Sequence, residues 1–175
     1  LRAARDLIPD ERIHDRTTRY LDLYRSLPAP RTSPYDGIPA MLDALLASPS
    51  PPRLGVLTNK PHDIATSLVR RLFPDIRFCA VEGVREGWPR KPDPTGLLRI
   101  IDSAGADNGS AIYVGDTDTD MKAGKAAGVF TIGCAWGFRD EDELTAHDAD
   151  AIAHHPSDLV SIARERLPAP RARPR

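Results

Sequence analysis

The sequence predicts an α/β fold in which a parallel sheet carries helices on both faces. From residue 38 onward, short apolar runs alternate with segments whose apolar residues recur every three or four positions. Such alternation of strand and helix is typical of sheets whose strands are joined by crossover helices. A second observation is the pattern at residues 111–127, where an apolar run ends at a glycine and an acidic turn opens a helix.

The predicted elements follow one another with short connections. Helices are expected where apolar residues form one stripe, at residues 38–46, 64–72, 97–104, 118–127, 141–146 and 156–167. Strands are expected at the short apolar runs, residues 54–57, 78–81, 111–114, 129–132 and 151–153, with a polar loop at 82–93. Pro61 is placed like the proline of a first helical turn. Crossover helices put the carboxyl ends of the strands on one edge of the sheet, so residues that follow the strands can meet there.

Composition excludes several classes of function. The chain has 175 residues, of which 41% are apolar and 28% charged, as in an ordinary globular protein. The formal net charge of −1 argues against a basic nucleic-acid-binding surface. No apolar run reaches membrane-spanning length and no signal-peptide pattern is visible, so we expect a cytoplasmic protein without a membrane partner. Cys79 and Cys134 lie in or beside apolar runs and are expected to be reduced thiols.

The two ends of the chain are set apart from its middle. Residues 1–28 carry a helical stripe, and a proline-rich segment follows it, with Pro28, Pro30 and Pro34. We therefore expect a domain boundary near residue 33. Residues 168–175 are rich in proline and arginine and are expected to be disordered. Because the first residue is a leucine inside a helical pattern, we expect a segment of a longer protein or a gene model that begins late.

The acidic turn after the strand at 111–114 is the first candidate site. Asp116 follows the strand, and Asp120 lies four residues on, in the first helical turn, where it can face the same pocket. Two converging carboxylates make a hard oxygen site suited to Mg²⁺. Capping of the helix by Asp or Thr explains the same residues about as well. A calcium-binding loop does not, because Met121 stands where that loop needs glycine and Ala127 where it needs glutamate.

Three further polar residues are expected at the same edge. Thr58 and Asn59 can hydrogen-bond phosphoryl oxygens, and Lys91 can neutralise their charge. Together with the acidic pair they offer the positioning and charge stabilisation that phosphoryl transfer needs. Each also has a simpler interpretation, Thr58 and Asn59 as a helix cap and Lys91 as a solvated loop charge. The order and spacing of the whole set favour the functional interpretation.

These motifs resemble those of the haloacid dehalogenase-like (HAD) hydrolases. Residues 56–61 resemble the second motif of that family, residues 91–94 the third, and residues 115–120 the fourth. The details are most similar to the phosphoglycolate phosphatase-like branch, in which a helical cap precedes the main domain. The resemblance covers nearly everything from Asp36 to about Ala163.

The resemblance implies a fold and two domains. Residues 34–167 would form the Rossmann-like core domain, and residues 1–33 would be the C-terminal part of a helical cap that closes over the substrate. The sequence departs from the family in one motif, Asp-x-Asp-Gly-Thr after an N-terminal strand, which it does not contain. That motif also provides the central strand of the family's sheet, between the strands that end near Thr58 and Asp116. We therefore expect a sheet whose central strand is missing, with unpaired backbone groups.

The resemblance also implies roles for the site residues. Thr58 would bind the phosphoryl group, Asn59 would help to orient it, and Lys91 would stabilise the phosphoryl group and the nucleophile. Asp116 would ligate Mg²⁺, and Asp120 would support the ion directly or through water. In the family the missing motif provides the nucleophilic aspartate, which becomes an aspartyl phosphate, and a second aspartate for acid–base catalysis.

The leading hypothesis is therefore a Mg²⁺-dependent phosphatase of small phosphate monoesters, with phosphoglycolate as the first candidate. Its expected partner is a small phosphorylated metabolite, and the chain by itself is expected to be inactive. One alternative is a non-catalytic fragment or remnant that binds Mg²⁺, phosphate or a partner. Within the enzymes, a sugar-phosphate mutase and a HAD phosphatase of other sugar or nucleotide phosphates also stay open.

Overall fold

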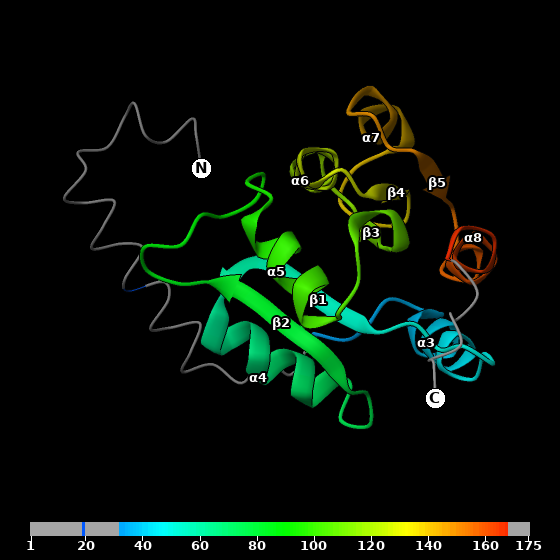
Figure 1. Ribbon diagram of the computed structural model, residues 1–175, viewed down its shortest axis with the longest axis horizontal. Coiled ribbons are helices and arrows are strands. Elements are labelled where there is room, and N and C mark those ends of the chain that lie inside the picture. The colour runs from blue at the N-terminus through cyan, green and yellow to red at the C-terminus, as the bar shows by residue number, and fades with distance from the viewer. Residues whose placement is uncertain (1–18, 20–31, 168–175) are drawn as a thin grey trace. The chain divides into compact units, whose positions relative to one another are not determined.

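A computed structural model describes residue 19 and residues 32–167 of the chain. The chain divides into two compact units, residues 1–33 and residues 34–175, and the elements of the second unit make up the fold (Figure 1). The helix expected over residues 1–28, apart from Arg19, and the tail expected at residues 168–175 lie outside the described residues. The assignment of residues 1–33 to a cap stays a prediction.

The second unit alternates strands and helices, as the sequence predicts. Its helices are α3 (Ile38–Leu46), α4 (His62–Leu72), α5 (Thr95–Ser103), α6 (Asp118–Ala127), α7 (Glu141–Ala146) and α8 (Asp158–Arg166), with a short 3-10 turn η1 (Asn108–Ser110). Its strands are β1 (Leu54–Pro61), β2 (Phe78–Val84), β3 (Ile112–Gly115), β4 (Phe130–Cys134) and β5 (Ala151–Ala153). The strands that pair run parallel. The predicted α/β fold is thereby confirmed.

Strands β1 and β2 are longer than predicted. Their apolar parts end near residues 57 and 81, but both continue through polar residues because the backbones go on pairing after a register shift, with Pro61 opposite Val84. Thr58 and Asn59 therefore lie inside β1 instead of following it. The prediction that Pro61 belongs to the first turn of α4 was wrong, since it stands just before that helix in an extended conformation, with φ −51° and ψ 140°.

The strands form two separate sheets, β1–β2 and β3–β4–β5. Both are visible in Figure 1, with β1 and β2 in cyan and green and β3 to β5 in green to orange. Among the described residues, no strand pairs with the second edge of β1 or of β3. The described strands thus form a sheet in two parts, as the resemblance to the family implies.

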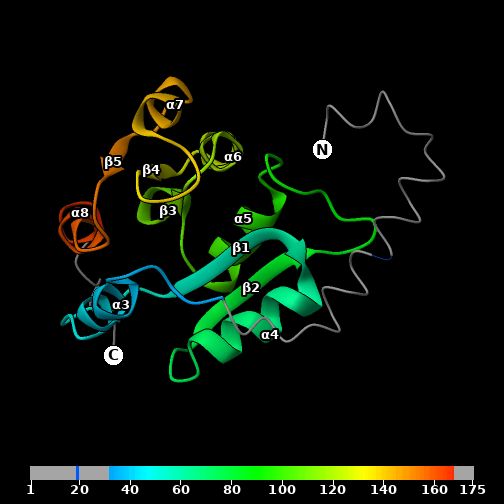
Figure 2. The ribbon, with the colours of Figure 1, turned by 180° about the vertical axis from the view of Figure 1, so that it is seen from behind.

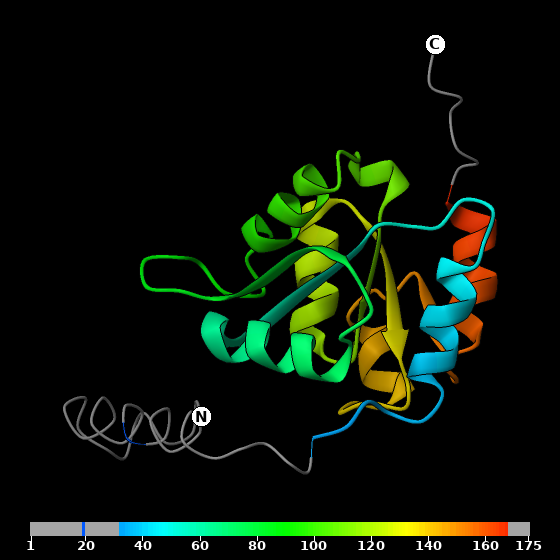
Figure 3. The same cartoon turned by 90° about the horizontal axis from the view of Figure 1, so that it is seen from below.

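Helices cover both faces of the sheets. Consecutive strand residues point to opposite faces, and Tyr113 and Ile112 accordingly belong to different hydrophobic clusters. The first cluster joins β3 to α5 and α6 through Leu97, Ile101, Tyr113, Ala123, Ala127 and Val129. The second joins β4 and β5 to α3 and α8 through Met41, Leu42, Ile132, Ala153 and Leu159. Figure 3 shows α3 and α8 side by side, and Figure 2 shows α4 against the β1–β2 sheet.

Two further expectations concern the thiols and the membrane. Cys79 and Cys134 are free cysteines, and burial raises the pKa of the Cys134 thiol to about 12. The helices of the described residues are all too short or too polar to cross a bilayer.

The packing of α7 on β4 gives a test of the fold. Leu144 on α7 has 0% of its surface exposed, whereas Leu98 on α5 has 39% exposed. Leu144→Ala should lower the free energy of unfolding by about 2–5 kcal/mol, because it leaves a cavity in the core. Leu98→Ala makes the same chemical change at the surface and should cost at most about 1 kcal/mol. Urea denaturation measures both values, and equal losses would contradict the burial of Leu144.

Candidate active site

The acidic turn between β3 and α6 forms one side of the site. Thr117 is the residue that caps α6, because its Oγ1 accepts a hydrogen bond from the backbone N–H of Asp120 at 3.2 Å. The helix ends at Ala127 and is followed by Gly128, which has a φ of 67° in the left-handed region that favours glycine. Since threonine makes the cap, the carboxylates of Asp116 and Asp120 are left for other contacts.

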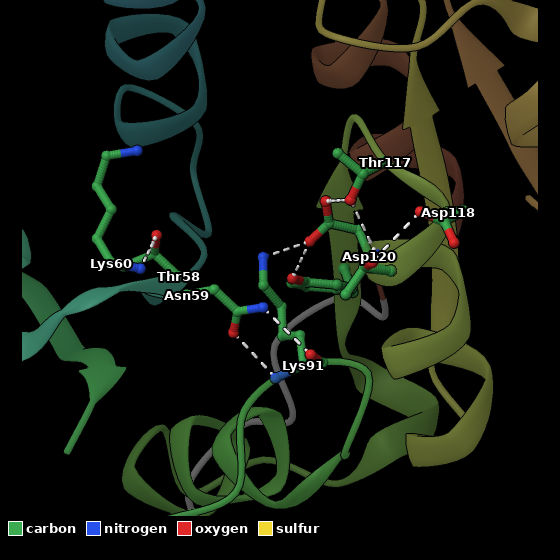
Figure 4. Close-up of polar contacts among 9 residues, drawn as sticks. Thr58, Asn59, Lys60, Lys91, Thr117, Asp118 and Asp120 are labelled. Carbon is green, nitrogen blue, oxygen red and sulfur yellow. Dashed lines mark hydrogen bonds and ion pairs between the residues drawn. The ribbon is translucent and has the colours of Figure 1, made fainter. Parts of the chain in front are cut away.

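Asp120 is buried, and both of its carboxylate oxygens accept hydrogen bonds (Figure 4). Its Oδ1 accepts from the Lys91 ammonium at 2.5 Å and from the Tyr113 hydroxyl at 2.7 Å. Its Oδ2 accepts from the Thr117 hydroxyl at 2.6 Å. Burial by itself raises the pKa of Asp120, but the Lys91 charge and the hydrogen bonds outweigh it and hold the pKa below its ordinary value of 3.8. Asp120 is therefore a charged group in a fixed orientation.

Lys91 is held at its backbone as well as at its ammonium. The Asn59 amide donates to the Lys91 carbonyl at 3.1 Å, and the Lys91 N–H donates to Asn59 Oδ1 at 3.0 Å. No side chain caps α4, so the interpretation of Asn59 as a helix cap was wrong. The Lys91 side chain is only 12% exposed, so the interpretation as a solvated loop charge was wrong too. Figure 4 shows Lys91 reaching from Asn59 to Asp120.

Thr58 precedes Asn59 on β1, and its contacts are local. Its Oγ1 accepts a hydrogen bond from the Lys60 N–H at 3.2 Å, and Figure 4 shows the Lys60 ammonium pointing away from Lys91. Among the described residues, no hydrogen bond links Thr58 to Lys91, Asp116 or Asp120. The structure therefore brings Asn59, Lys91 and Asp120 into contact and leaves Thr58 beside them on the same strand.

Asp116 is oriented by the loop that follows β4. Its Oδ2 accepts a hydrogen bond from the Phe138 N–H at 3.1 Å. Gly137 allows this approach, because a Cβ there would clash with the Asp116 Cβ and lie 2.5 Å from Oδ2. No described residue donates a hydrogen bond to the other oxygen, Oδ1. Asp116 can therefore offer a carboxylate oxygen to a ligand.

The fit of these donors to Mg²⁺ is partial. In the part of the chain that the structure describes, no group of three or more His, Cys, Asp or Glu residues is placed to hold a metal ion. Proteins commonly bind Mg²⁺ through one or two carboxylates, with water and substrate phosphate as the other ligands. Asp116 suits one such position, whereas the oxygens of Asp120 are already engaged by protein donors.

Sequence reasoning did not single out Tyr113 or the Gly137–Phe138 pair as site residues. Tyr113 lies in a buried strand, and burial together with the Asp120 charge raises the pKa of its hydroxyl. The available signal was a tyrosine inside an apolar run, since a buried tyrosine hydroxyl usually needs a partner. Phe138 contributes only its backbone N–H, which every residue but proline has, so no pattern could have marked it.

The hydroxyl of Tyr113 gives a test of the Asp120 network. Tyr113→Phe should lower the free energy of unfolding by about 1.5–3 kcal/mol at neutral pH, because it removes a hydrogen bond to a charged group. Asp120 is charged in both folded and unfolded protein at neutral pH, and its folded pKa lies below the ordinary value of 3.8. The stability that its charged form contributes is lost as the pH falls through that lowered pKa. The difference between the two proteins should therefore shrink below pH 3.8.

Urea denaturation at a series of pH values measures this difference. Tyr35→Phe is the matched control, because Tyr35 is 51% exposed. A loss that does not change with pH, or that equals the loss in the control, would argue against the network.

Known proteins are similar to this chain in sequence and in fold. The model of the haloacid dehalogenase-like hydrolase family matches residues 2–134. An N-acetylmuramic acid 6-phosphate phosphatase of Pseudomonas aeruginosa is 32% identical over 144 residues, which cover 82% of this chain and 63% of that protein. A phosphoglycolate phosphatase of Rhodospirillum rubrum is 38% identical over 126 residues, covering 72% of this chain and 52% of that protein.

Solved structures show the same fold. A putative phosphoglycolate phosphatase from Lactobacillus delbrueckii subsp. bulgaricus superposes with a TM-score of 0.82 at 24% identity, over 90% of this chain and 65% of that one. The present chain thus spans less than two thirds of the length of each of these three proteins. The family match, which takes in most of the sequence, agrees with the three motifs and with the fold. The chain belongs to the haloacid dehalogenase-like hydrolases.

Proposed function

We propose that this chain forms the core of a Mg²⁺-dependent phosphatase that acts on small phosphate monoesters. One observation carries the proposal: the ammonium of Lys91 is fixed by Asp120 and its backbone by Asn59, at the edge of the sheet where the acidic turn lies. Membership of a hydrolase family with phosphatase relatives supports it.

Lys91 is suited to stabilise a phosphoryl group in transfer. An ammonium has three N–H donors, and Lys91 uses one on Asp120, which leaves two for phosphoryl oxygens. A cation that is already oriented stabilises developing negative charge without reorganising during the reaction. The Asn59 side chain forms two hydrogen bonds with the backbone of Lys91. We therefore propose that Asn59 acts on the phosphoryl group indirectly, by positioning Lys91. The Thr58 hydroxyl is the neighbouring donor for a phosphoryl oxygen.

Asp116 is the residue that we propose to hold Mg²⁺. Its open oxygen, Oδ1, and its fixed orientation on the Phe138 N–H support this role. A bound Mg²⁺ would add positive charge beside the phosphoryl oxygens. We propose that Asp120 serves mainly to orient Lys91, because its oxygens already accept three side-chain hydrogen bonds.

Neither carboxylate of the site suits the role of the attacking nucleophile. Attack needs a carboxylate oxygen whose lone pair is available, and the oxygens of Asp120 are engaged by Lys91, Tyr113 and Thr117. Asp116 is the candidate metal ligand. We therefore propose that the nucleophilic aspartate belongs to the Asp-x-Asp-Gly-Thr motif, which the 175-residue sequence does not contain.

The missing motif also favours a second candidate, a non-catalytic module that binds phosphate or Mg²⁺ through Lys91 and Asp116. The two candidates differ in whether a longer form of the protein turns over substrate. Phosphoglycolate and N-acetylmuramic acid 6-phosphate are the first substrates to test, because relatives carry those names. A sugar-phosphate mutase would isomerise a sugar phosphate without releasing phosphate.

We expect the 175-residue chain to release no phosphate from these esters, with or without Mg²⁺. A longer form, translated from coding sequence that supplies Asp-x-Asp-Gly-Thr, should hydrolyse at least one of them in a Mg²⁺-dependent reaction. Assay of inorganic phosphate measures both. Turnover by the short chain would refute the assignment of the nucleophile. A longer form that is folded but inert towards every ester would refute the phosphatase proposal and leave the binding module.

In an active longer form, Lys91→Ala should lower kcat by about 100- to 1,000-fold, the scale on which a preorganised donor acts. The matched control is Lys125→Ala, because Lys125 also forms an ion pair with an aspartate, Asp150. That pair links α6 to the residue before β5 and lies outside the site, so its loss should leave kcat within about twofold of the unchanged enzyme. Similar losses in the two variants would contradict a catalytic role for Lys91.

A further inference from the structure

The loop that carries Lys91 projects from the rest of the unit. It joins β2 to α5 over residues 85–94, and Figures 1 and 3 show it in green. Two hydrogen bonds to the Asn59 side chain hold Lys91 itself. A segment on the surface has few contacts to restrict it, so residues 85–90, which lead from β2 to Lys91, need an anchor of their own if Lys91 is to stay in place.

One side chain of this loop is covered while its neighbours are not. Trp88 is half-buried, whereas Glu86, Gly87, Pro89 and Arg90 are exposed. A tryptophan has the largest apolar surface of any side chain, and its cover in an otherwise exposed loop indicates a packing contact. Trp88 is therefore the candidate anchor of the loop.

Two arginines pack against the Trp88 ring. The guanidinium carbon of Arg99 lies 3.9 Å from the ring centroid, and that of Arg85 lies 4.6 Å from it. Both distances fall within the range of about 6 Å in which a cation is attracted to an aromatic face, and tryptophan is the strongest partner for such contacts. Arg85 directly follows β2 and Arg99 lies on α5, so the ring links the start of the loop to the helix after it.

Both arginines are held in turn by regular structure. Arg85 donates from Nη1 to Glu82 Oε2 at 2.6 Å and from Nη2 to His62 Nε2 at 3.0 Å. Arg99 belongs to α5, which is fixed to the core through the buried side chain of Ile100. The Trp88 ring thus rests on two supports whose own positions are set by β2, α4 and α5.

The anchor lies close to Lys91 along the chain. Trp88 precedes Lys91 by three residues, and on the other side the Asp93 N–H donates to the Arg90 carbonyl at 3.0 Å, which closes a turn around Lys91. A movement of Trp88 would therefore move Lys91. Catalysis is sensitive to such movement, because a displacement of about 1 Å can lower a rate by about 100-fold.

We propose that Trp88 is a positioning residue for Lys91. Its ring, packed against Arg85 and Arg99, fixes the loop so that the Lys91 ammonium stays on Asp120. Trp88 acts through Lys91 alone and touches neither the phosphoryl group nor the metal. The effect on catalysis rests on the phosphatase proposal, whereas the effect on the position of Lys91 does not.

Hydrogen exchange of the Lys91 N–H in the 175-residue chain tests the position directly, because this group donates to Asn59. Trp88→Ala should speed its exchange by about 5- to 30-fold, the effect of losing two cation–π contacts. Trp88→Phe keeps an aromatic face and should restore most of the slow exchange. The Thr131 N–H, which donates to Asp150 at 2.8 Å, should keep its rate. Unchanged exchange at Lys91, or equal acceleration at Thr131, would overturn the proposal.

A matched pair of arginine variants separates this contact from cation–π contacts in general. Arg166 lies 4.1 Å from the Phe130 ring centroid, at the start of β4 and so away from Lys91. Arg99→Met should speed exchange of the Lys91 N–H by about two- to fivefold, as expected for one contact, and Arg166→Met should leave it unchanged. Circular dichroism verifies that both variants fold. Equal effects of the two substitutions on Lys91 would argue against an anchor at Trp88.

Kinetics of an active longer form test the effect on catalysis. Trp88→Ala should lower kcat by at least about fivefold but less than Lys91→Ala does, with KM within about threefold. Added to Lys91→Ala, it should lower kcat by no more than about twofold further, because the group that it positions is gone. A full further loss in that background would overturn the proposal, since Trp88 would then act without Lys91. If Lys91→Ala itself left kcat unchanged, the phosphatase proposal would fail, and the exchange measurements would still decide whether Trp88 positions Lys91.

Discussion

The ion pair between Lys91 and Asp120 connects the parts of the molecule that hold the two sheets, which no hydrogen-bond ladder between described strands joins. Lys91 lies in the loop after β2, whereas Asp120 follows β3 in the other sheet. Removing two charges from water is costly, and such a pair is favourable only when further hydrogen bonds satisfy the remaining groups. The hydroxyls of Tyr113 and Thr117 do this for Asp120, and Asn59 holds the backbone of Lys91. The orientation of the site therefore depends on this one contact and its supports.

Most of the fold could be predicted because apolar residues mark both the buried stripe of a helix and the buried run of a strand. The helix at Glu141–Ala146 and the strand at Ala151–Ala153 have the bounds that the pattern gave. The ends of β1 and β2 could not be predicted in this way. The apolar runs stop before these ends, and the residues there stay in the strands because the two backbones go on pairing, with Pro61 opposite Val84.

The sequence could predict which residues of the candidate site lie close together, because strand topology determines this. The carboxyl ends of parallel strands meet, so Asn59, Lys91 and Asp120 were expected to lie together, and they are in contact. Which lone pair meets which donor depends on side-chain rotamers and on distant segments. The hydrogen bond from the Phe138 N–H to Asp116 is of this kind and leaves no signal in local sequence, whereas for Asp120 the only signal was a tyrosine inside an apolar run, Tyr113.

The division into two sheets also bears on how cooperatively the unit unfolds. A continuous ladder would spread the loss of one strand along the whole sheet, but among the described strands the ladder stops at β1 and begins again at β3. The two sheets are coupled through side-chain packing, as where Leu57 of β1 packs against the cluster that contains Tyr113, and through the Lys91–Asp120 ion pair. The segment from β1 to β2 and the segment from β3 to β5 are each continuous in the chain, so each is a natural unit of local opening. Two regions of this molecule can therefore lose their structure at different free energies within one compact body.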